Sequence, residues 1–563
     1  MKAKIIIIVT ILLLLFNISM FCQQPYMVKD INPGTNTSFF QPKFAKVNET
    51  LFFAANDGTN GYELWKSDGT NAGTVMVKDI YPGYTTSGIA YSSEPRNLTN
   101  VNGTLFFTAN NGINGRELWK SDGTEAGTIM VKDIDPSFSN PLELTNVNGI
   151  LFFTANTSAN GVELWKSDGT DAGTIMVIDI YQGSTNGVPN SAAPVSLINV
   201  NGILYFDAKN GNDFGKLWKS DGTTSGTVMI IGYPETTQTM IDVGKLYNIN
   251  NTLYLTFYDN FNGTELWKSD GTTAGTVMIK DIYPGYNVQV DIANSSVPSN
   301  LTSVNGTIFF SACDSQIDSN NRNFELWKTD GTAAGTVKVK EIRNGTFNYG
   351  SQPSILTNAN GILYFSSNDG INGIELWKSD GTENGTTIIK DLYSGPGNSE
   401  PNELTYINGL TYFVANDGII GQELFKTDGT AAGTTGFDIR LSESSSPEYL
   451  TNVNGKLFFT ATNGGQSGRE LWVLDTNSLS TDENFINNNK FSIFPNPVNS
   501  VLTIQNLDNK FIYKISVIDL TGKKVLEQNI NSDTINVEKL QNGMYLLQIL
   551  SEEKYSVSKF IKN

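Results

Sequence analysis

Short apolar runs separated by glycine-containing turns fill most of the chain, and the stretch from 98 to 134 shows the recurring unit. Asn102-Gly103 favours a two-residue type I′ hairpin turn. Residues 110–115 offer several positions that tolerate positive φ, as a loop requires, and Asp122-Gly123-Thr124 ends a third run. These turns divide the stretch into four predicted strands, at 98–101, 104–109, 117–121 and 128–134. The density of turn signals excludes a helical solenoid, and we expect a four-stranded antiparallel sheet.

The unit recurs nine times, and each copy carries a version of Glu-Leu-Trp-Lys-Ser-Asp-Gly-Thr in its third predicted strand. The ninth marker position holds Phe425 instead of tryptophan. The marker tryptophans are all the tryptophans of the chain: Trp65, Trp119, Trp165, Trp218, Trp267, Trp327, Trp377 and Trp472. Neighbouring markers lie between 46 residues (Trp119 to Trp165) and 60 residues (Trp267 to Trp327) apart. A period near 50 with four strands per unit is typical of β-propeller blades and close to the kelch period.

The two ends of the array complement each other. The segment 26–34 matches 75–83, the fourth strand of a unit, although no first three strands precede it. The last unit has its third strand at 470–472 and continues into 474–475 without a fourth. We therefore expect the N-terminal strand to complete the last unit and close an all-β ring of nine four-stranded blades. Nine exceeds the usual range of about four to eight blades, so two smaller propellers or an open twisted array remain alternatives.

The first 22 residues have the pattern of a signal peptide. Two lysines precede the apolar run 5–16, which is shorter than the ~20 residues needed to span a bilayer but suits the core of an export signal. We expect cleavage between Cys22 and Gln23. The alternative is a lipoprotein acylated on Cys22. Because no other segment is long and apolar enough to cross a membrane, we expect no transmembrane span after signal removal.

The composition changes after the array, which we expect to cover 23–475. The polar, Asn- and Ser-rich segment 476–490 is typical of a linker. A second module, 491–563, follows it. Its predicted strands lie at 501–504, 513–518 and 545–549, with turns at 520–522 and 542–543. These strands suffice for a small β-sandwich.

Three motifs in this second module carry a resemblance. They are Phe494-Pro-Asn-Pro497, the run 517–523 (Val-Ile-Asp-Leu-Thr-Gly-Lys) and the run 540–545 (Leu-Gln-Asn-Gly-Met-Tyr), with Lys559 near the end. The module resembles the C-terminal type A sorting domain of the type IX secretion system of Bacteroidetes. The resemblance implies that 491–563 contacts that secretion machinery. It also implies that the protein reaches the cell surface or the medium through the periplasm and across the outer membrane.

The repeats themselves resemble the ELWxxDGT repeats of bacterial surface and secreted proteins, over roughly 26–475. That name describes a sequence unit and implies no activity.

Composition excludes several functions. The net charge is −18, which argues against a nucleic-acid partner because such binding relies on Lys and Arg neutralising phosphates. The chain has no histidine, which removes histidine-dependent triads and histidine metal sites. Cys313 is the single cysteine outside the signal peptide, so no intramolecular disulfide is expected.

Residues that recur in every copy are better explained by packing than by one active site. We expect the tryptophans to fill the space between neighbouring sheets; the alternative is a row of sugar-stacking platforms. The recurring aspartates precede Gly-Thr, where their side chains cap turns; the alternative is calcium, which takes oxygen ligands. We therefore expect no cofactor, with calcium kept as the alternative. These aspartates are Asp68, Asp122, Asp168, Asp221, Asp270, Asp330, Asp380 and Asp428.

A glutamate begins the third strand in eight copies, and Lys216 replaces it in the fourth. We expect these glutamates to be structural, paired with the lysine two or three positions on. Paired carboxylates can also cleave sugars without histidine, so an enzyme is not excluded. The glutamates are Glu63, Glu117, Glu163, Glu265, Glu325, Glu375, Glu423 and Glu470.

Ligand binding is expected where the copies differ, because variable loops on a rigid scaffold commonly carry function. The candidate loops are 314–323 beside Cys313, 84–94 and 286–297. No catalytic, cofactor-binding or metal-binding residue is identified, and the ligand, a glycan or a protein, stays unknown. We expect a non-enzymatic, exported surface or extracellular binding or adhesion protein. The alternatives are a secreted carbohydrate-active lyase or hydrolase, and a structural surface-layer role.

Overall fold

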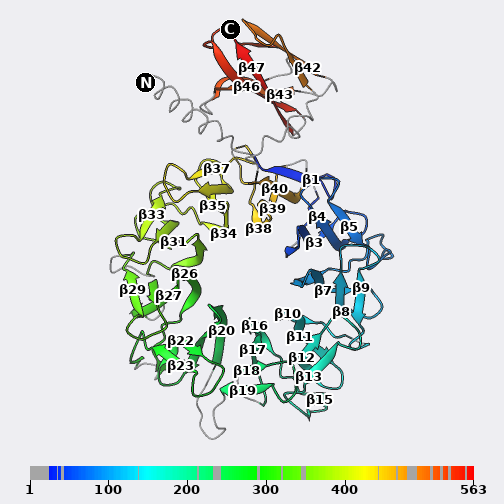
Figure 1. Ribbon diagram of the computed structural model, residues 1–563, viewed down its shortest axis with the longest axis vertical. Coiled ribbons are helices and arrows are strands. Elements are labelled where there is room, and N and C mark those ends of the chain that lie inside the picture. Colours follow the sequence, from blue (N-terminus) through cyan, green and yellow to red (C-terminus); the bar gives the residue numbers. More distant parts are fainter. Residues whose placement is uncertain are drawn as a thin grey trace, which may run out of the picture. The chain divides into compact units, whose positions relative to one another are not determined.

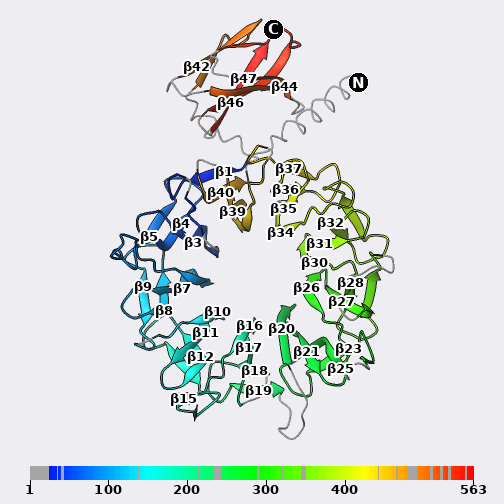
Figure 2. The ribbon, with the colours of Figure 1, turned by 180° about the vertical axis from the view of Figure 1, so that it is seen from behind.

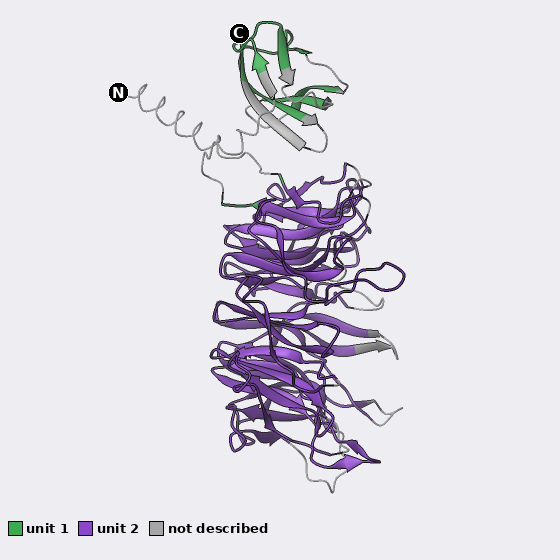
Figure 3. Cartoon of the chain, turned by 90° about the vertical axis from the view of Figure 1, so that its right-hand side faces the viewer, with its two compact units in different colours: residues 1–24, 475–563 green, residues 25–474 purple. Residues whose placement is uncertain are grey.

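The computed structural model describes residues 24–563 except 35, 40–42, 137, 212–214, 232–241, 288–291, 319–320, 344–349, 442, 465–466, 478–490, 507–511, 520–523, 530–533 and 552–553. The described residues form strands, turns and loops without a helix. The chain divides into two compact units, Pro25–Leu474 and a second unit made of Met1–Gln24 with Asp475–Asn563 (Figure 3). The expected signal peptide, with Cys22 and Gln23, lies outside the described residues, as does most of the expected linker.

Within the described residues, the larger unit contains nine four-stranded antiparallel sheets that follow one another in chain order (Figure 1), together with two two-stranded hairpins between them. We number them sheets 1 to 9. The first four are sheet 1 (β2 Ala45–Val47, β3 Thr50–Asn56, β4 Tyr62–Ser67, β5 Val75–Lys78), sheet 2 (β6 Arg96–Val101, β7 Thr104–Asn110, β8 Arg116–Ser121, β9 Ile129–Lys132), sheet 3 (β10 Leu142–Val147, β11 Ile150–Thr157, β12 Gly161–Ser167, β13 Ile175–Ile178) and sheet 4 (β16 Val195–Val200, β17 Ile203–Ala208, β18 Lys216–Ser220, β19 Val228–Ile231).

The remaining sheets repeat this order. They are sheet 5 (β20 Asp242–Ile249, β21 Thr252–Asp259, β22 Gly263–Ser269, β23 Val277–Lys280), sheet 6 (β26 Ser299–Val304, β27 Thr307–Asp318, β28 Asn321–Thr329, β29 Val337–Lys340), sheet 7 (β30 Ser354–Ala359, β31 Ile362–Asn368, β32 Ile374–Ser379, β33 Thr387–Lys390), sheet 8 (β34 Asn402–Ile407, β35 Leu410–Asn416, β36 Gln422–Thr427, β37 Thr435–Phe437) and sheet 9 (β38 Glu448–Val453, β39 Lys456–Thr462, β40 Arg469–Asp475, β1 Tyr26–Lys29).

The strands of sheet 2 confirm the prediction made from its turns. Each of the four predicted runs overlaps one strand, β6 to β9, within two residues at either end. Asn102 and Gly103 join β6 to β7 with φ of 50° and 86°. Positive φ at both central residues is what a type I′ turn requires, so the local sequence fixes this hairpin.

Strands from the two ends of the array share sheet 9, as the matching ends predict. β1 pairs antiparallel with β40, placing Tyr26 opposite Val473 and Met27 opposite Trp472 (Figure 1, Figure 2). Sheet 9 then contacts sheet 1: Lys29 Nζ donates to the Thr74 carbonyl at 2.8 Å and Lys456 Nζ to the Asp68 carbonyl at 2.7 Å. The Lys29 contact has a counterpart between sheets 1 and 2, where Lys78 Nζ donates to the Thr128 carbonyl at 2.9 Å.

The marker tryptophans lie between sheets, as expected from their recurrence. Trp119 of sheet 2 is buried in a cluster with residues from both sheet 1 and its own sheet, including Phe52, Leu64 and Phe107. Trp65 does the same between sheets 9 and 1. Burying a side chain of this size contributes roughly 2–3 kcal/mol. The packing interpretation is therefore confirmed for these tryptophans.

The smaller unit contains two sheets around one apolar core. The first sheet has the order β41 (Phe491–Phe494), β42 (Val501–Asn506) and β45 (Thr534–Asn536), and the second the order β44 (Lys524–Asn529), β43 (Ile512–Ile518), β46 (Gly543–Ser551) and β47 (Lys554–Lys562). Leu502 from the first sheet and Ile515, Leu547 and Phe560 from the second share the core. This arrangement is the small β-sandwich that the sequence predicts, although the expected turn at 520–522 lies outside the described residues.

Candidate binding face and its glutamate supports

The variable loops emerge from one edge of the sheets. Because neighbouring strands run antiparallel, the loop after the second strand and the loop after the fourth strand leave a sheet at the same edge. We call the first kind tip loops and the second kind, which run to the next sheet, link loops. Their common edge is the loop face. In the side view of Figure 3, the longer loops of this unit extend from one side.

All three candidate loops belong to the loop face. Residues 84–94 and 286–297 lie in link loops, and 314–323 spans the paired ends of β27 and β28 at the tip of sheet 6, where residues 319–320 lie outside the described residues. Two of the link loops form small hairpins: one contains a bridge between Tyr84 and Ala90, and the other pairs β24 (Tyr286–Asn287) with β25 (Ile292–Ala293). The structure therefore brings the sequence candidates to a common side of the array.

A fourth variable loop was missed by the sequence analysis. The link loop between sheets 3 and 4 forms a hairpin of β14 (Ser184–Thr185) and β15 (Val188–Pro189). Its signal in the sequence was Asn186-Gly187, the same dipeptide that marks the hairpin turns.

The tip loops present apolar side chains on fixed turns. In sheet 2, Asn111 Oδ1 accepts hydrogen bonds from the backbone N–H groups of Ile113, at 3.0 Å, and Asn114, at 2.9 Å. Asp369 holds Ile371 in the same way in sheet 7, and Asp417 holds Ile419 in sheet 8. Ile113, Ile371 and Ile419 are 84%, 74% and 78% exposed. Each loop thus holds an isoleucine out in water.

Exposed hydrophobic side chains are concentrated on this face. Within the described part of the array, every large hydrophobic residue that is at least half exposed lies in a tip loop or a link loop. Those residues are Tyr84, Ile89, Ile113, Phe138, Val188, Phe261, Tyr286, Ile371, Ile419 and Leu441. Single exposed apolar residues are ordinary, but their confinement to one side makes the loop face the candidate for binding.

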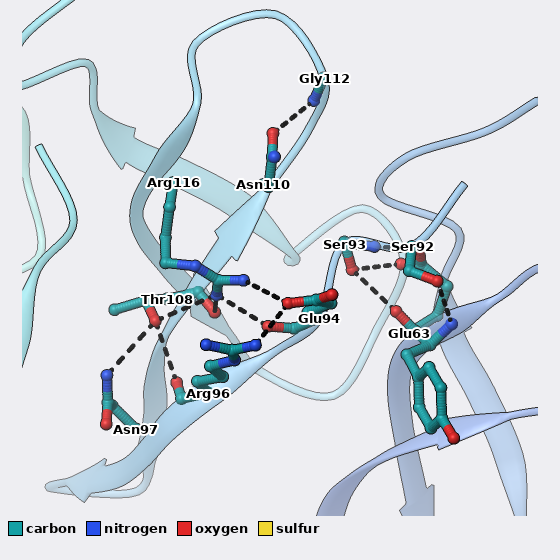
Figure 4. Close-up of polar contacts among 11 residues, drawn as sticks. Glu63, Ser92, Ser93, Glu94, Arg96, Asn97, Thr108, Asn110, Gly112 and Arg116 are labelled. Carbon is teal, nitrogen blue, oxygen red and sulfur yellow. Dashed lines mark hydrogen bonds and ion pairs between the residues drawn. The ribbon is translucent and has the colours of Figure 1, made fainter. Parts of the chain in front are cut away.

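A buried glutamate holds both ends of a link loop. Glu63, at the start of β4, is fully buried. Its Oε2 accepts a hydrogen bond from the Ile80 N–H at 2.9 Å. Its Oε2 also accepts one from Ser93 Oγ at 2.6 Å (Figure 4), and its Oε1 accepts one from the Ser93 N–H at 2.9 Å. Ile80 begins the link loop between sheets 1 and 2, and Ser93 lies near its end. Burial raises the pKa of Glu63 to about 7.

This arrangement, a buried glutamate that holds a link loop and that we call the glutamate clamp, recurs around the array. Burial also raises the pKa of the equivalent carboxyls, Glu375 among them. The pKa rises to about 8 in Glu470 and to about 7 in Glu117, Glu163, Glu265, Glu325 and Glu423. Serine hydroxyls donate to five of them, and the donors are Ser296, Ser351, Ser399, Ser445 and Ser38. Ser139, which stands at the equivalent position for Glu117, donates its hydroxyl to the Arg116 carbonyl at 3.2 Å. Glu470, near the end of the array, holds Ile31 and Ser38 near its beginning.

The predicted pairing of these glutamates with lysine is wrong. Lys66 lies three residues after Glu63, and an odd spacing places the two side chains on opposite faces of a strand. Lys66 Nζ instead donates to the Gly123 carbonyl of sheet 2 at 2.8 Å. The serine partner was missed, although it stands two residues before a proline in most link loops, as in Ser93-Glu94-Pro95. The glutamates are structural, with a different partner from the one expected.

The fourth copy lacks the carboxyl. Lys216 occupies the glutamate position of sheet 4, and its Nζ donates to Asn210 Oδ1 at 2.9 Å. Residues 232–241 of the link loop that follows lie outside the described residues.

The recurring aspartates cap turns on the edge opposite the loop face. Asp122 Oδ1 accepts hydrogen bonds from the Thr124 N–H at 2.8 Å and from Thr124 Oγ1 at 2.7 Å. The Thr124 hydroxyl bond lowers the pKa of Asp122. The turn interpretation is confirmed. Among the described residues, no three Cys, Asp or Glu side chains gather in a way that could hold a metal, and calcium bound through other oxygens stays a prediction.

Comparison with known proteins identifies the smaller unit. Residues 492–563 match the family model of the secretion system C-terminal sorting domain. Ulvan lyase NLR42 of Nonlabens ulvanivorans is 31% identical over 99 residues, which are 17% of this chain and 18% of that protein. The chain thus matches less than a fifth of the length of that curated relative.

Two solved structures align with most of the chain at low similarity. They are the extracellular domain of BT4673 from B. thetaiotaomicron (11% identity, 92% of this chain, 85% of that chain, TM-score 0.28) and PorZ, a surface component of the type IX secretion system of Porphyromonas gingivalis (12% identity, 92% of this chain, 75% of that chain, TM-score 0.24). At these TM-scores the alignments carry no argument about function.

The sorting domain settles where the protein goes. Among the described residues, no helix has the length and apolar character needed to cross a membrane. A type IX sorting domain implies contact with that secretion machinery. The C-terminal unit is therefore a secretion system sorting domain, and it directs export across the outer membrane to the cell surface or the extracellular space.

Proposed function

We propose that the repeat array is a non-enzymatic binding module that contacts its ligand, a glycan or a protein, through the loop face. The observation that carries this proposal is the confinement of half-exposed hydrophobic side chains to that face. The tip turns that hold Ile113, Ile371 and Ile419 reduce the entropy lost on binding, because the loops are already fixed. Export by the sorting domain would deliver this face to the outside of the cell.

The proposed scaffold is a single closed propeller of nine blades. Its support is the pairing of β1 with β40 and the contacts of sheet 9 with sheet 1. Closure leaves no sheet without a neighbour, which protects edges that would otherwise aggregate. A closed ring would also hold the tip loops at fixed mutual distances.

A secreted carbohydrate-active enzyme is the second candidate. The short match to ulvan lyase favours it. The glutamates with raised pKa would have suitable proton affinity for general acid catalysis. They are nevertheless fully buried, and Glu63 has both carboxyl oxygens engaged by hydrogen bonds that hold a link loop. This geometry favours binding over catalysis.

One experiment separates the two candidates. The mature protein is screened against immobilised polysaccharides and matrix proteins, and each polysaccharide is assayed for cleavage. A triple variant, Ile113→Thr, Ile371→Thr and Ile419→Thr, should lose binding, because Thr59 shows that threonine fits the equivalent tip turn. Ile129→Thr with Ile175→Thr, exposed on outer strands away from the loop face, is the matched control. Cleavage of a polymer would support the enzyme; binding unaffected by the triple variant would contradict the proposal.

A further inference from the structure

We infer that the loop face receives a cationic polypeptide that also carries apolar side chains. This inference rests on the proposed binding function and adds the chemistry of the partner. It is carried by two features of the tip loops, exposed apolar side chains and carboxylates on the same turns.

The tip loops place a carboxylate beside an apolar side chain. Asp369 caps the turn of Ile371, and Asp417 caps the turn of Ile419. In sheet 5, Asp259 accepts the backbone N–H of Phe261, a residue that is 63% exposed. Carboxylates and apolar side chains therefore alternate within single turns. A partner complementary to this pattern needs both positive charge and apolar surface.

The loops of the loop face carry fewer Lys and Arg residues than Asp and Glu residues, and several cations on the strands beside them are paired within the protein. Among the described residues, Lys43, Lys209 and Arg343 of these loops have no carboxylate within ion-pair distance. Arg96 and Arg116 both pair with Glu94, and Lys338 pairs with Asp314 and Glu341 (Figure 4 shows the first pairs). Arg440 pairs with Glu443 and Arg469 with Glu448 in the same way.

Several tip carboxylates lack such a partner. Among the residues that the structure describes, Asp57, Asp369 and Asp417 are partly exposed and have no Lys or Arg nitrogen within ion-pair distance. Asp259 is buried, and its carboxylate accepts hydrogen bonds from Phe261 and Asn262 of its own turn. Neighbouring carboxylates reinforce one another: Asp57 raises the pKa of Asp79, after the larger effect of burial, and Asp259 acts on Asp281 in the same way. The face thus keeps uncompensated negative charge.

This charge decides between partner classes. An anionic polysaccharide, a nucleic acid or an anionic lipid surface would meet repulsion from a chain of net charge −18. A neutral glycan could donate hydroxyl hydrogen bonds to these carboxylates, but it would not neutralise their charge. A basic polypeptide gains electrostatic steering from them, and its apolar side chains gain the burial of the isoleucine tips.

Defined peptides test the partner chemistry on the full mature chain. Three soluble peptides of equal length are compared, one of Lys and Leu, one of Lys and Ser, and one of Glu and Leu. We expect the Lys/Leu peptide to bind at least about tenfold more tightly than either other peptide, because only it matches both features. Raising the salt concentration should weaken this binding.

Substitutions that the chain already tolerates elsewhere provide the variants. Asp369→Asn with Asp417→Asn keeps the turns, since Asn111 makes the same hydrogen bonds. It should weaken Lys/Leu binding several-fold at low salt. Glu125→Gln with Glu383→Gln, exposed on the opposite edge, makes the same change in net charge. This control should change the affinity less than about twofold. The triple tip variant should weaken binding about tenfold.

The outcomes distinguish the inference from the proposed function. Equal loss in the loop-face and opposite-edge charge variants would overturn the inference, because binding would then follow net charge alone. A glycan that binds in a tip-dependent way while the Lys/Leu peptide does not would also overturn it, yet would support the proposed function. If no probe responds to the tip substitutions, both fail.

Discussion

The glutamate clamp of sheet 3 is incomplete, which allows a precise stability prediction. Ala192 stands where most copies have serine, and only its N–H reaches Glu163, at 2.9 Å. Ala192→Ser should add a hydroxyl that donates to Glu163 Oε2, as Ser93 Oγ does to Glu63 at 2.6 Å. Ser93→Ala is the matched reverse change, because Ala192 shows that alanine fits this position.

The size of the effect follows from the ionisation state. A hydrogen bond to a charged group contributes about 1.5–3 kcal/mol, and one between neutral groups about 0.5–1.5 kcal/mol. The pKa of Glu163 is about 7, so its carboxyl is mainly ionised at pH 8 and mainly protonated at pH 5. We expect Ala192→Ser to stabilise the link loop by about 1–2 kcal/mol at pH 8 and by about half of that at pH 5. The added bond should also lower the pKa of Glu163.

Hydrogen exchange measures this loop directly. Protection of amides 180–192 should increase in Ala192→Ser, and protection of 80–93 should decrease in Ser93→Ala, with other link loops unchanged as internal controls. Unfolding temperature should move in the same directions. If Ala192→Ser leaves exchange unaltered at pH 8, or lowers protection there, the assignment of the clamp as a loop support is refuted.

Three further predictions follow from the fold. The pKa values of Glu63 and Glu470 in the folded protein, about 7 and about 8, exceed the ordinary 4.5. Protonation of these carboxyls therefore stabilises the fold; this contribution is complete below pH 4.5 and is lost as pH rises through the folded-state pKa values. Thermal unfolding between pH 5 and pH 8.5 should therefore show the higher melting temperature at pH 5; equal values would argue against the raised pKa. Trp119→Ala should cost about 3–5 kcal/mol of unfolding free energy by opening the space between sheets 1 and 2, and a cost below about 1 kcal/mol in denaturant titration would contradict the packing. Removal of 491–563 should leave the protein in the periplasm, as cell fractionation would show; normal export would refute the sorting role.

The sequence predicted the local units well because their signals are local. Asn102-Gly103 forms the observed turn, with two positive φ angles, at little cost. The turns on either side of each apolar run limit its strand to a few residues. The pairing of β1 with β40 was predictable because two segments 439 residues or more apart carry matching fragments of one unit. Because the unit is repeated, this long-range contact could be recognised from the sequence.

The clamp could not be predicted in the same way. Glu63 reaches a serine thirty residues later, and only the fold brings these residues together. The neighbouring lysine was the obvious partner by proximity, but strand geometry directs it to the adjacent sheet. The loop face was likewise hidden, because exposure of Ile113, Ile371 and Ile419 depends on turns whose sequences resemble any polar loop.

We propose that ligands meet the array on its loop face. Hydrogen exchange of the mature protein, with and without the first ligand captured in the binding screen, tests it most directly. Protection should appear in the tip and link loops, such as 110–116, 368–374 and 416–422, and should be absent from the turns that begin at Asp122, Asp380 and Asp428 on the opposite edge. Protection confined to those turns would contradict the account.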